Sequence, residues 1–82
     1  MNHIVSEVTE RKYWDIGDLS KMLNVQDSKI RFWCNYFGLK IKRGAANKRK
    51  FTHEDVEVIK TIKFYVDEGY HLKAIFKKLN PQ

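Results

Sequence analysis

The ten residues from Ser28 to Phe37 constrain the fold most, because their apolar side chains follow the period of an α-helix. At 100° per residue, one stripe of this helix is apolar and contains Ile30, Trp33, Cys34 and Phe37. The opposite face has no acid and contains Ser28, Arg31, Phe32 and Asn35. Arginine and asparagine make bidentate hydrogen bonds to base edges, and serine also binds phosphates. The pattern predicts an amphipathic helix whose exposed face reads DNA.

The net charge of +6 lies entirely in the residues that follow this helix. Residues 1–39 contain five acids and five bases, residues 40–50 contain six bases and no acid, and residues 51–82 contain five of each. A solvated protein face usually mixes acids with bases, so an unbalanced basic cluster favours a polyanionic partner. We therefore expect double-stranded DNA as the partner.

Length and composition exclude several classes of protein. A chain of 82 residues suffices for one small domain with a modest core but no deep pocket. The single cysteine excludes an internal disulfide and a cysteine-based zinc site. No run approaches the roughly 18 consecutive apolar residues of a membrane-spanning helix, and no charged-then-apolar leader opens the chain. We expect a cytoplasmic, nucleoid-associated protein without membrane contact.

Local signals predict two helices joined by a short polar turn. Asp15 is an N-cap, and Asp18 three residues later completes a capping-box variant. The first helix then carries its apolar side chains at Ile16, Leu19 and Leu23 and ends at Asn24, with Val25 in the turn. Capping side chains for the second helix are offered by Gln26, Asp27 and Ser28. Gly38 closes that helix. This order is typical of a helix-turn-helix.

A hairpin and two more helices are predicted downstream. Residues 39–42 alternate apolar and basic side chains as a strand, residues 44–47 turn, and residues 48–51 return, while Tyr13-Trp14 is a short pair suited to a minimal strand. Thr52-x-x-Asp55 opens the third helix, which Gly69 ends. The apolar arc of that helix holds Val58, Ile59, Ile62, Tyr65 and Val66, and the fourth helix holds Leu72, Ile75, Phe76 and Leu79.

The predicted fold is therefore mostly α, a winged helix-turn-helix with four helices and a two-stranded hairpin wing between helices two and three. We expect a flexible arm at residues 1–12, the domain at residues 13–79 and a tail at residues 80–82.

Four motifs in this order resemble the DNA-binding domain of the MerR family of bacterial regulators. They are Tyr13-x-x-Ile16-Gly17-x-Leu19, Ile30-Arg31-Phe32-Trp33, Arg49-x-Phe51-Thr52-x-Glu54-Asp55 and Ile62 through Gly69 to Leu72-x-x-Ile75. The resemblance implies a bacterial transcription regulator that reads the major groove with its second helix and grips phosphates with its wing. Relatives usually continue into a long dimerisation helix, which nothing in this chain supplies. We expect a monomer, with dimerisation only through segments absent here.

The candidate DNA-binding residues are Ser28, Lys29, Arg31, Phe32, Asn35, Lys42, Arg43, Lys48, Arg49 and Lys50. Alternation along a hairpin allows only some wing bases to face DNA together, and we favour Arg43 and Arg49. Cys34 is expected to be a small core residue. No catalytic set, metal-ligand spacing or phosphate-binding glycine loop is found, so we expect no enzyme activity, metal or cofactor.

Two alternatives remain open. An architectural or phage-type DNA-binding protein, such as an excisionase, a packaging component or a chromosome-anchoring module, shares the fold without regulating a promoter. A protein–protein interaction domain is the second alternative, supported by Phe64 among polar residues of the third predicted helix and opposed by the basic wing.

Overall fold

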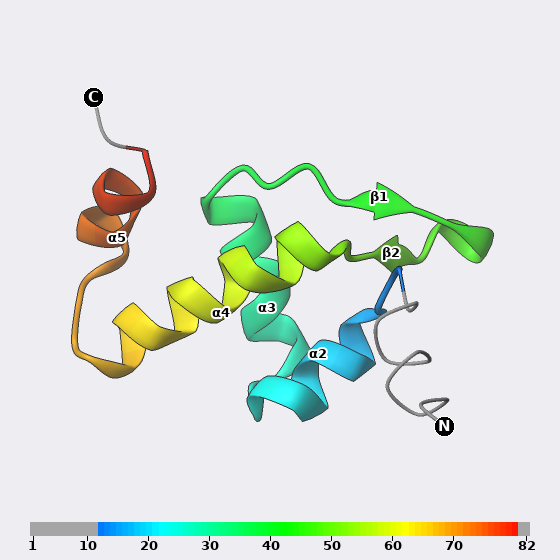
Figure 1. Cartoon of the computed structure of the whole chain (residues 1–82), viewed down its shortest axis with the longest axis horizontal. Coiled ribbons are helices and arrows are strands. Elements are labelled where there is room, and N and C mark those ends of the chain that lie inside the picture. The colour runs from blue at the N-terminus through cyan, green and yellow to red at the C-terminus, as the bar shows by residue number, and fades with distance from the viewer. Residues whose placement is uncertain (1–11, 81–82) are drawn as a thin grey trace, which may run out of the picture.

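A computed structural model describes residues 12–80, which form four helices and one short hairpin (Figure 1). The hairpin lies between the second and third helices, so the predicted winged helix-turn-helix is confirmed. In Figure 1, helix α4 crosses α3, with the hairpin at one end of the molecule and α5 at the other. The predicted arm, apart from Lys12, and the end of the tail at residues 81–82 lie outside the described residues.

The first helix of the turn motif, α2 (Ile16–Leu23), begins and ends as predicted. The Asp15 carboxylate accepts a hydrogen bond from the amide of Asp18 at 2.8 Å, and the Asp18 carboxylate accepts one from the amide of Asp15 at 3.0 Å. Asn24 ends the helix in the left-handed conformation, with φ of 56°. Val25 then packs partly buried against the core. These local contacts fix the entry and exit of the turn.

The second helix, α3 (Asp27–Tyr36), corrects one prediction. Its N-cap is Gln26, which makes no side-chain capping hydrogen bond. The helix starts at Asp27, so Asp27 and Ser28 lie inside its first turn and are not in the N-cap position. Gly38, with φ of 66°, ends the helix as expected, and the amide of Leu39 donates to the carbonyl oxygen of Cys34 at 2.9 Å.

The hairpin is shorter than predicted. Strands β1 (Lys42–Arg43) and β2 (Arg49–Lys50) pair antiparallel, joined by a 3-10 turn at Ala45–Asn47. The predicted start of the first strand at residue 39 was wrong. The backbone groups of Thr52, which would extend the pairing beyond Lys42 and Lys50, form hydrogen bonds within α4 instead. The amide of Thr52 donates to the Asp55 carboxylate at 2.9 Å, and the carbonyl oxygen of Thr52 accepts from Val56 at 3.0 Å. Helix α4 therefore takes the groups that would extend the ladder.

Two further helices complete the domain. The capping box of Thr52 and Asp55 opens α4 (His53–Asp67), as predicted. Gly69, with φ of 95°, ends it, and the amide of Tyr70 donates to the carbonyl oxygen of Tyr65 at 3.0 Å. Helix α5 (Leu72–Leu79) follows and ends at Asn80. Within residues 12–80, no helix has the length and apolar character needed to cross a membrane.

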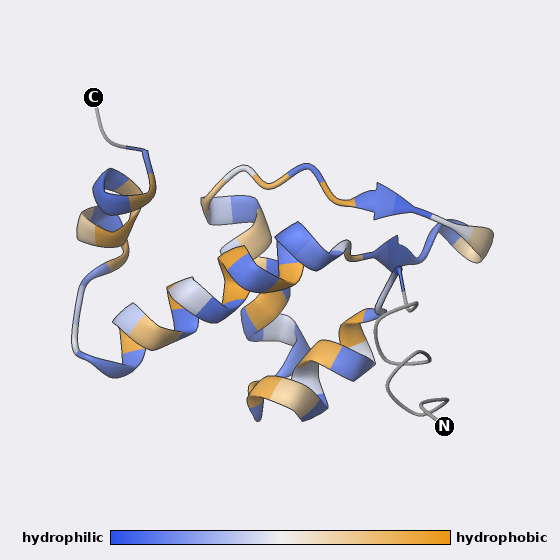
Figure 2. Ribbon diagram, in the orientation of Figure 1, coloured by the Kyte–Doolittle hydropathy of each residue, from blue (hydrophilic) through white to orange (hydrophobic). Residues whose placement is uncertain are grey.

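The core is built around α4, which packs against α2, α3 and α5. Figure 2 shows hydrophobic residues on each of these helices. The buried side chains of the core are Leu19, Leu23, Ile30, Trp33, Cys34, Phe37, Phe51, Val56, Ile59, Ile62 and Ile75. The predicted apolar stripe of α3 is thus confirmed in full. Phe51 and Val56 are buried members that the sequence patterns did not identify. Phe76 was expected in the apolar stripe of α5 but is 41% exposed, and its ring stacks on that of Phe37 with centroids 6.1 Å apart.

Candidate nucleic-acid interface

The predicted reading face of α3 is on the surface. Ser28, Arg31, Phe32 and Asn35 are all exposed, and Phe32 is 52% exposed. Because Ser28 does not cap the helix, its hydroxyl stays available on this face. The four side chains therefore form one exposed surface without an acid, which we call the α3 face.

Lys29 lies at one edge of the α3 face. At 100° per residue it points about 160° away from Arg31 but only about 60° from Phe32. It lines a shallow groove beside the turn with Asn24, Lys63 and Asp67. Lys29 is therefore a neighbour of Phe32 on the helix surface but lies far from Arg31.

Phe32 has an aromatic neighbour that the sequence patterns missed. Its ring centroid lies 6.0 Å from that of Tyr36, one helical turn later, and Tyr36 is itself 41% exposed. The spacing of four residues was the available signal, since residues at i and i+4 meet on a helix surface. The α3 face thus continues into a second exposed ring.

The wing (residues 40–50) has two chemically different faces. The register places Arg43 opposite Arg49 and Lys42 opposite Lys50. Directly opposite side chains share a face of a hairpin, and like charges in this position repel. The Nη1 atom of Arg43 donates to the carbonyl oxygen of Asn47, a neutral partner, at 3.1 Å, and no acid among the described residues pairs with it. The arginine pair therefore presents two adjacent cations on one face.

Lys50 is held by an aromatic ring. Its Nζ atom lies 4.2 Å from the ring centroid of Tyr13, a cation–π contact. The stem of Lys50 also covers Gly44, where an added Cβ would lie 2.5 Å from the Cδ of Lys50. Tyr13 comes just before Trp14, whose backbone bonds Phe51 in both directions at 2.9 and 2.8 Å. The segment before α2 thus fixes the lysine face of the wing.

The arginine face of the wing borders the start of α2. An open cavity of about 310 Å³ is lined by Asp15, Ile16, Gly17, Arg43, Asn47, Lys48 and Arg49. Lys48 is exposed at its edge. The cavity is therefore basic on its wing side and offers backbone from the beginning of a helix on the other.

Cys34 links this face electrostatically to α3. Burial raises the pKa of the Cys34 thiol, the charge of Arg49 lowers it, Asp55 raises it and Arg43 lowers it to a smaller extent. Both guanidinium groups are therefore close enough to the buried side of α3 to act on its thiol. Cys34 is 3% exposed, which confirms its expected place in the core.

Within the part of the chain that the structure describes, no group of three or more His, Cys, Asp or Glu side chains is placed to hold a metal ion.

The helix order, the turn between α2 and α3, and the hairpin before α4 define a winged helix-turn-helix domain. The family described as MerR HTH family regulatory protein matches residues 15–81. The chain therefore belongs to the MerR helix-turn-helix family, a family of DNA-binding regulators. No curated protein matches the chain.

Proposed function

We propose that the chain is a bacterial transcription regulator that binds double-stranded DNA at a specific sequence. In this proposal, residues 28–36 read the major groove and the wing grips phosphates. The observation that carries it is the pairing of an exposed, acid-free α3 face with a wing (residues 40–50) that holds all of the net charge. The family to which the chain belongs supports the DNA-binding part.

The proposed roles on α3 follow from chemistry. Arg31 and Asn35 are one turn apart, and both side chains suit bidentate hydrogen bonds to base edges. Ser28, near the start of the helix, suits a phosphate oxygen. Phe32 offers an apolar ring to a thymine methyl group. Lys29, at the edge of the face and beside the groove near the turn, suits a flanking phosphate.

The proposed roles in the wing follow from its two faces. Arg43 and Arg49 repel each other until an anion lies between or beside them, so a phosphate is the natural partner of this face. Lys42 and Lys48 are exposed and suit neighbouring phosphates. Lys50 is proposed as a weaker contributor, because its ammonium already faces the Tyr13 ring.

We also propose that the 82-residue chain is cytoplasmic and monomeric and binds one half-site. Phe64, at 57% exposed, is the large apolar side chain of α4 left on the surface, and one ring does not fill a dimer interface of ordinary size. Sedimentation equilibrium at micromolar concentration tests this. A tight dimer that dissociates on Phe64→Ser contradicts it.

Selection of bound sites from a random duplex pool tests the proposed function. The proposal expects one enriched half-site, and Arg31→Ala should relax the preference at one position of that site. Enrichment of a DNA shape without a consensus would instead favour an architectural protein. If neither the unaltered chain nor Arg31→Ala enriches any duplex, the proposed DNA binding is contradicted.

A further inference from the structure

A chain of aromatic rings runs from the α3 face to the last helix. The ring centroids of Phe32 and Tyr36 are 6.0 Å apart, those of Tyr36 and Phe37 are 5.0 Å apart, and those of Phe37 and Phe76 are 6.1 Å apart. Phe37 is buried, whereas Tyr36 and Phe76 are each 41% exposed. The C-terminal end of α3 and helix α5 therefore share an exposed aromatic surface.

This surface borders an open groove of about 450 Å³ between the two helices. The groove is lined by Tyr36, Lys73, Phe76, Lys77 and Asn80. Lys73 and Lys77 are one helical turn apart on α5, and both are exposed. Residues 69–80 contain three lysines and no acid. Within residues 12–80, neither Lys73 nor Lys77 forms an ion pair. The groove thus combines an apolar floor with a positively charged rim.

The chemistry of the groove differs from what duplex DNA requires. In a duplex the bases are stacked inside, and the backbone offers phosphates and sugar edges with little apolar surface. Lysines alone would suit the phosphates of a duplex, but the two half-exposed rings beside the groove would bury little apolar surface against it. A peptide segment offers both an apolar side chain and carboxylates. Aromatic anchors in pockets supply most of the affinity of such contacts, and surrounding charges supply selectivity and rate.

We propose that this groove binds a short acidic segment of a partner protein, with an aromatic or aliphatic side chain between Tyr36 and Phe76 and carboxylates beside Lys73 and Lys77. The interaction is additional to DNA binding and does not depend on it, although Tyr36 also ends the segment (residues 28–36) proposed to read DNA. It gives the domain a second, protein-directed surface at the end of the molecule opposite the wing (Figure 1).

Selection of peptides from a random display library on the full chain, followed by fluorescence anisotropy of the selected peptides, tests this proposal. The expected peptides carry an aromatic or large aliphatic residue flanked by Asp or Glu. The double variant Lys73→Glu, Lys77→Glu should weaken them by about tenfold, because two favourable surface pairs become repulsive. Replacing the acids of the peptide by lysine should then restore binding to this variant.

Matched controls separate the groove from general charge and fold. Lys21→Glu with Lys60→Glu makes the same change of charge on exposed lysines of α2 and α4 and should leave peptide binding nearly unchanged. Phe76→Ser should also weaken binding, whereas Phe64→Ser on α4 should not. Thermal melting of each variant identifies any loss of fold. If Phe76→Ser fails to fold, the comparison of the Lys73→Glu, Lys77→Glu variant with its lysine control still tests the proposal.

Four results would overturn the proposal. One is enrichment of peptides without acids. Another is that a single-stranded oligothymidine binds at the Tyr36 and Phe76 rings more tightly than any selected peptide does. A third is a larger loss of duplex affinity with the α5 lysine pair than with the control pair, which would assign the groove to DNA. The last is dimerisation that Phe76→Ser abolishes, which would make a second copy the occupant. Loss of duplex binding alone leaves the peptide result unaffected, so the two functions fail separately.

Discussion

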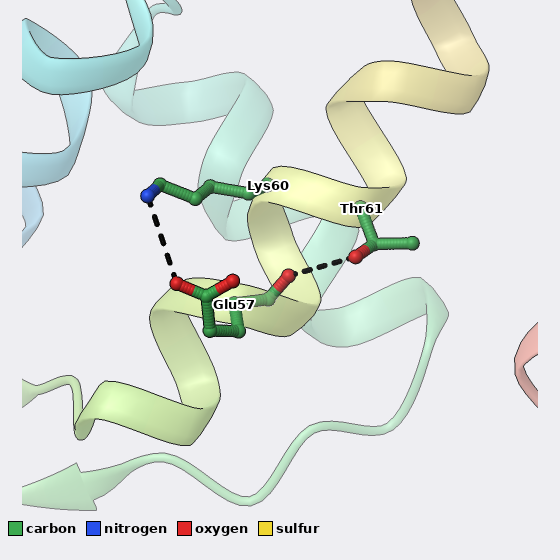
Figure 3. A network of polar contacts seen from close by, with 3 residues as sticks. All are labelled: Glu57, Lys60 and Thr61. Carbon is green, nitrogen blue, oxygen red and sulfur yellow. Dashed lines mark hydrogen bonds and ion pairs between the residues drawn. The ribbon is translucent and has the colours of Figure 1, made fainter.

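The wing and helix α4 carry their charges in opposite ways. Residues 40–50 contain six bases and no acid, whereas α4 contains two lysines and four acids. On α4, the Nζ atom of Lys60 lies 3.6 Å from the Glu57 carboxylate. The backbone carbonyl oxygen of Glu57 accepts a hydrogen bond from the Thr61 hydroxyl at 2.9 Å (Figure 3). Lys63 pairs with Asp67 in the same way. Among the described residues, no base of the wing is paired with an acid; Lys50 and Arg43 have a ring and a carbonyl oxygen as their partners.

The difference shows how charge can be used on a surface. Pairs one turn apart on an exposed helix satisfy each other and contribute little to stability. Cations facing each other across a hairpin destabilise it until an anion arrives. Both lysines of α4 therefore have their acidic partners within the helix, and the cations of the wing require a partner from outside.

The largest expected effect tests the core on which both regions rest. Trp33 is 2% exposed, so Trp33→Ala should lower the free energy of unfolding by about 3–5 kcal/mol, the cost of an aromatic truncation in a core. Urea denaturation followed by circular dichroism measures it. Phe64→Ala, at a 57% exposed ring, is the matched control and should change stability by less than about 0.5 kcal/mol. Equal losses would mean that the two rings do not differ in burial.

The next effect concerns Arg31. If its guanidinium reads a guanine, Arg31→Ala should weaken binding to the selected site by about 1–3 kcal/mol and relax preference at one base pair. Binding of a panel of single-base variants measures both quantities. Lys60→Ala, which removes an exposed base already paired on α4, should alter neither. Uniform weakening on every sequence would reassign Arg31 to a phosphate.

A smaller effect is expected where the wing passes into α4. The Oγ1 atom of Thr52 accepts a hydrogen bond from the amide of Asp55 at 3.1 Å, so Thr52→Ala should cost about 1 kcal/mol of stability. Thr61→Ala removes a hydroxyl that bonds a carbonyl within the helix and should cost less than about 0.5 kcal/mol. Chemical denaturation of both variants measures the difference. Equal losses of stability would show that the capping hydrogen bond of Thr52 contributes no more than the hydrogen bond of Thr61.

Features set by neighbours in sequence were predicted well. Both capping boxes, the left-handed Asn24 and the glycines that end α3 and α4 depend on contacts within one or two turns. Features set by distant neighbours were not. The short first strand depends on how α4 uses the backbone of Thr52, and the stacking of Phe76 on Phe37 depends on how α5 packs beside the end of α3.

The candidate site also has one part that depends on sequence neighbours and one that depends on distant residues. The α3 face follows from the helical period alone, and its exposure is confirmed. The separation of the wing into an arginine face and a lysine face depends on the register, and the contact of Lys50 with Tyr13 joins segments far apart in the chain. Sequence patterns carry no signal for that contact. The assignment of these side chains to DNA stays a prediction.

The smallest effect concerns the thiol between the two regions. Because the folded-state pKa of Cys34 is raised, the unfolded chain loses its thiol proton first, and the free energy of unfolding should fall as pH rises above about 8.5. Cys34→Ala should lack this component. Arg49→Ala removes the stronger of the two lowering charges, so it should raise the pKa of Cys34 further, whereas Lys60→Ala should not. The pH dependence of alkylation of the folded chain measures the shift, and its absence in Arg49→Ala would place that guanidinium elsewhere.

The central claim is that the cations of the wing, unlike those of α4, meet phosphates. Duplex affinity measured over a range of salt concentrations tests it most directly. If four or five bases of the wing contact phosphates, log K against log salt should have a slope of roughly −4, and Arg43→Ala with Arg49→Ala should flatten it by about two units. The matched pair Lys60→Ala with Lys63→Ala should leave the slope unchanged. The same slope in the arginine variant as in the unaltered chain would contradict the claim and remove the wing from the DNA.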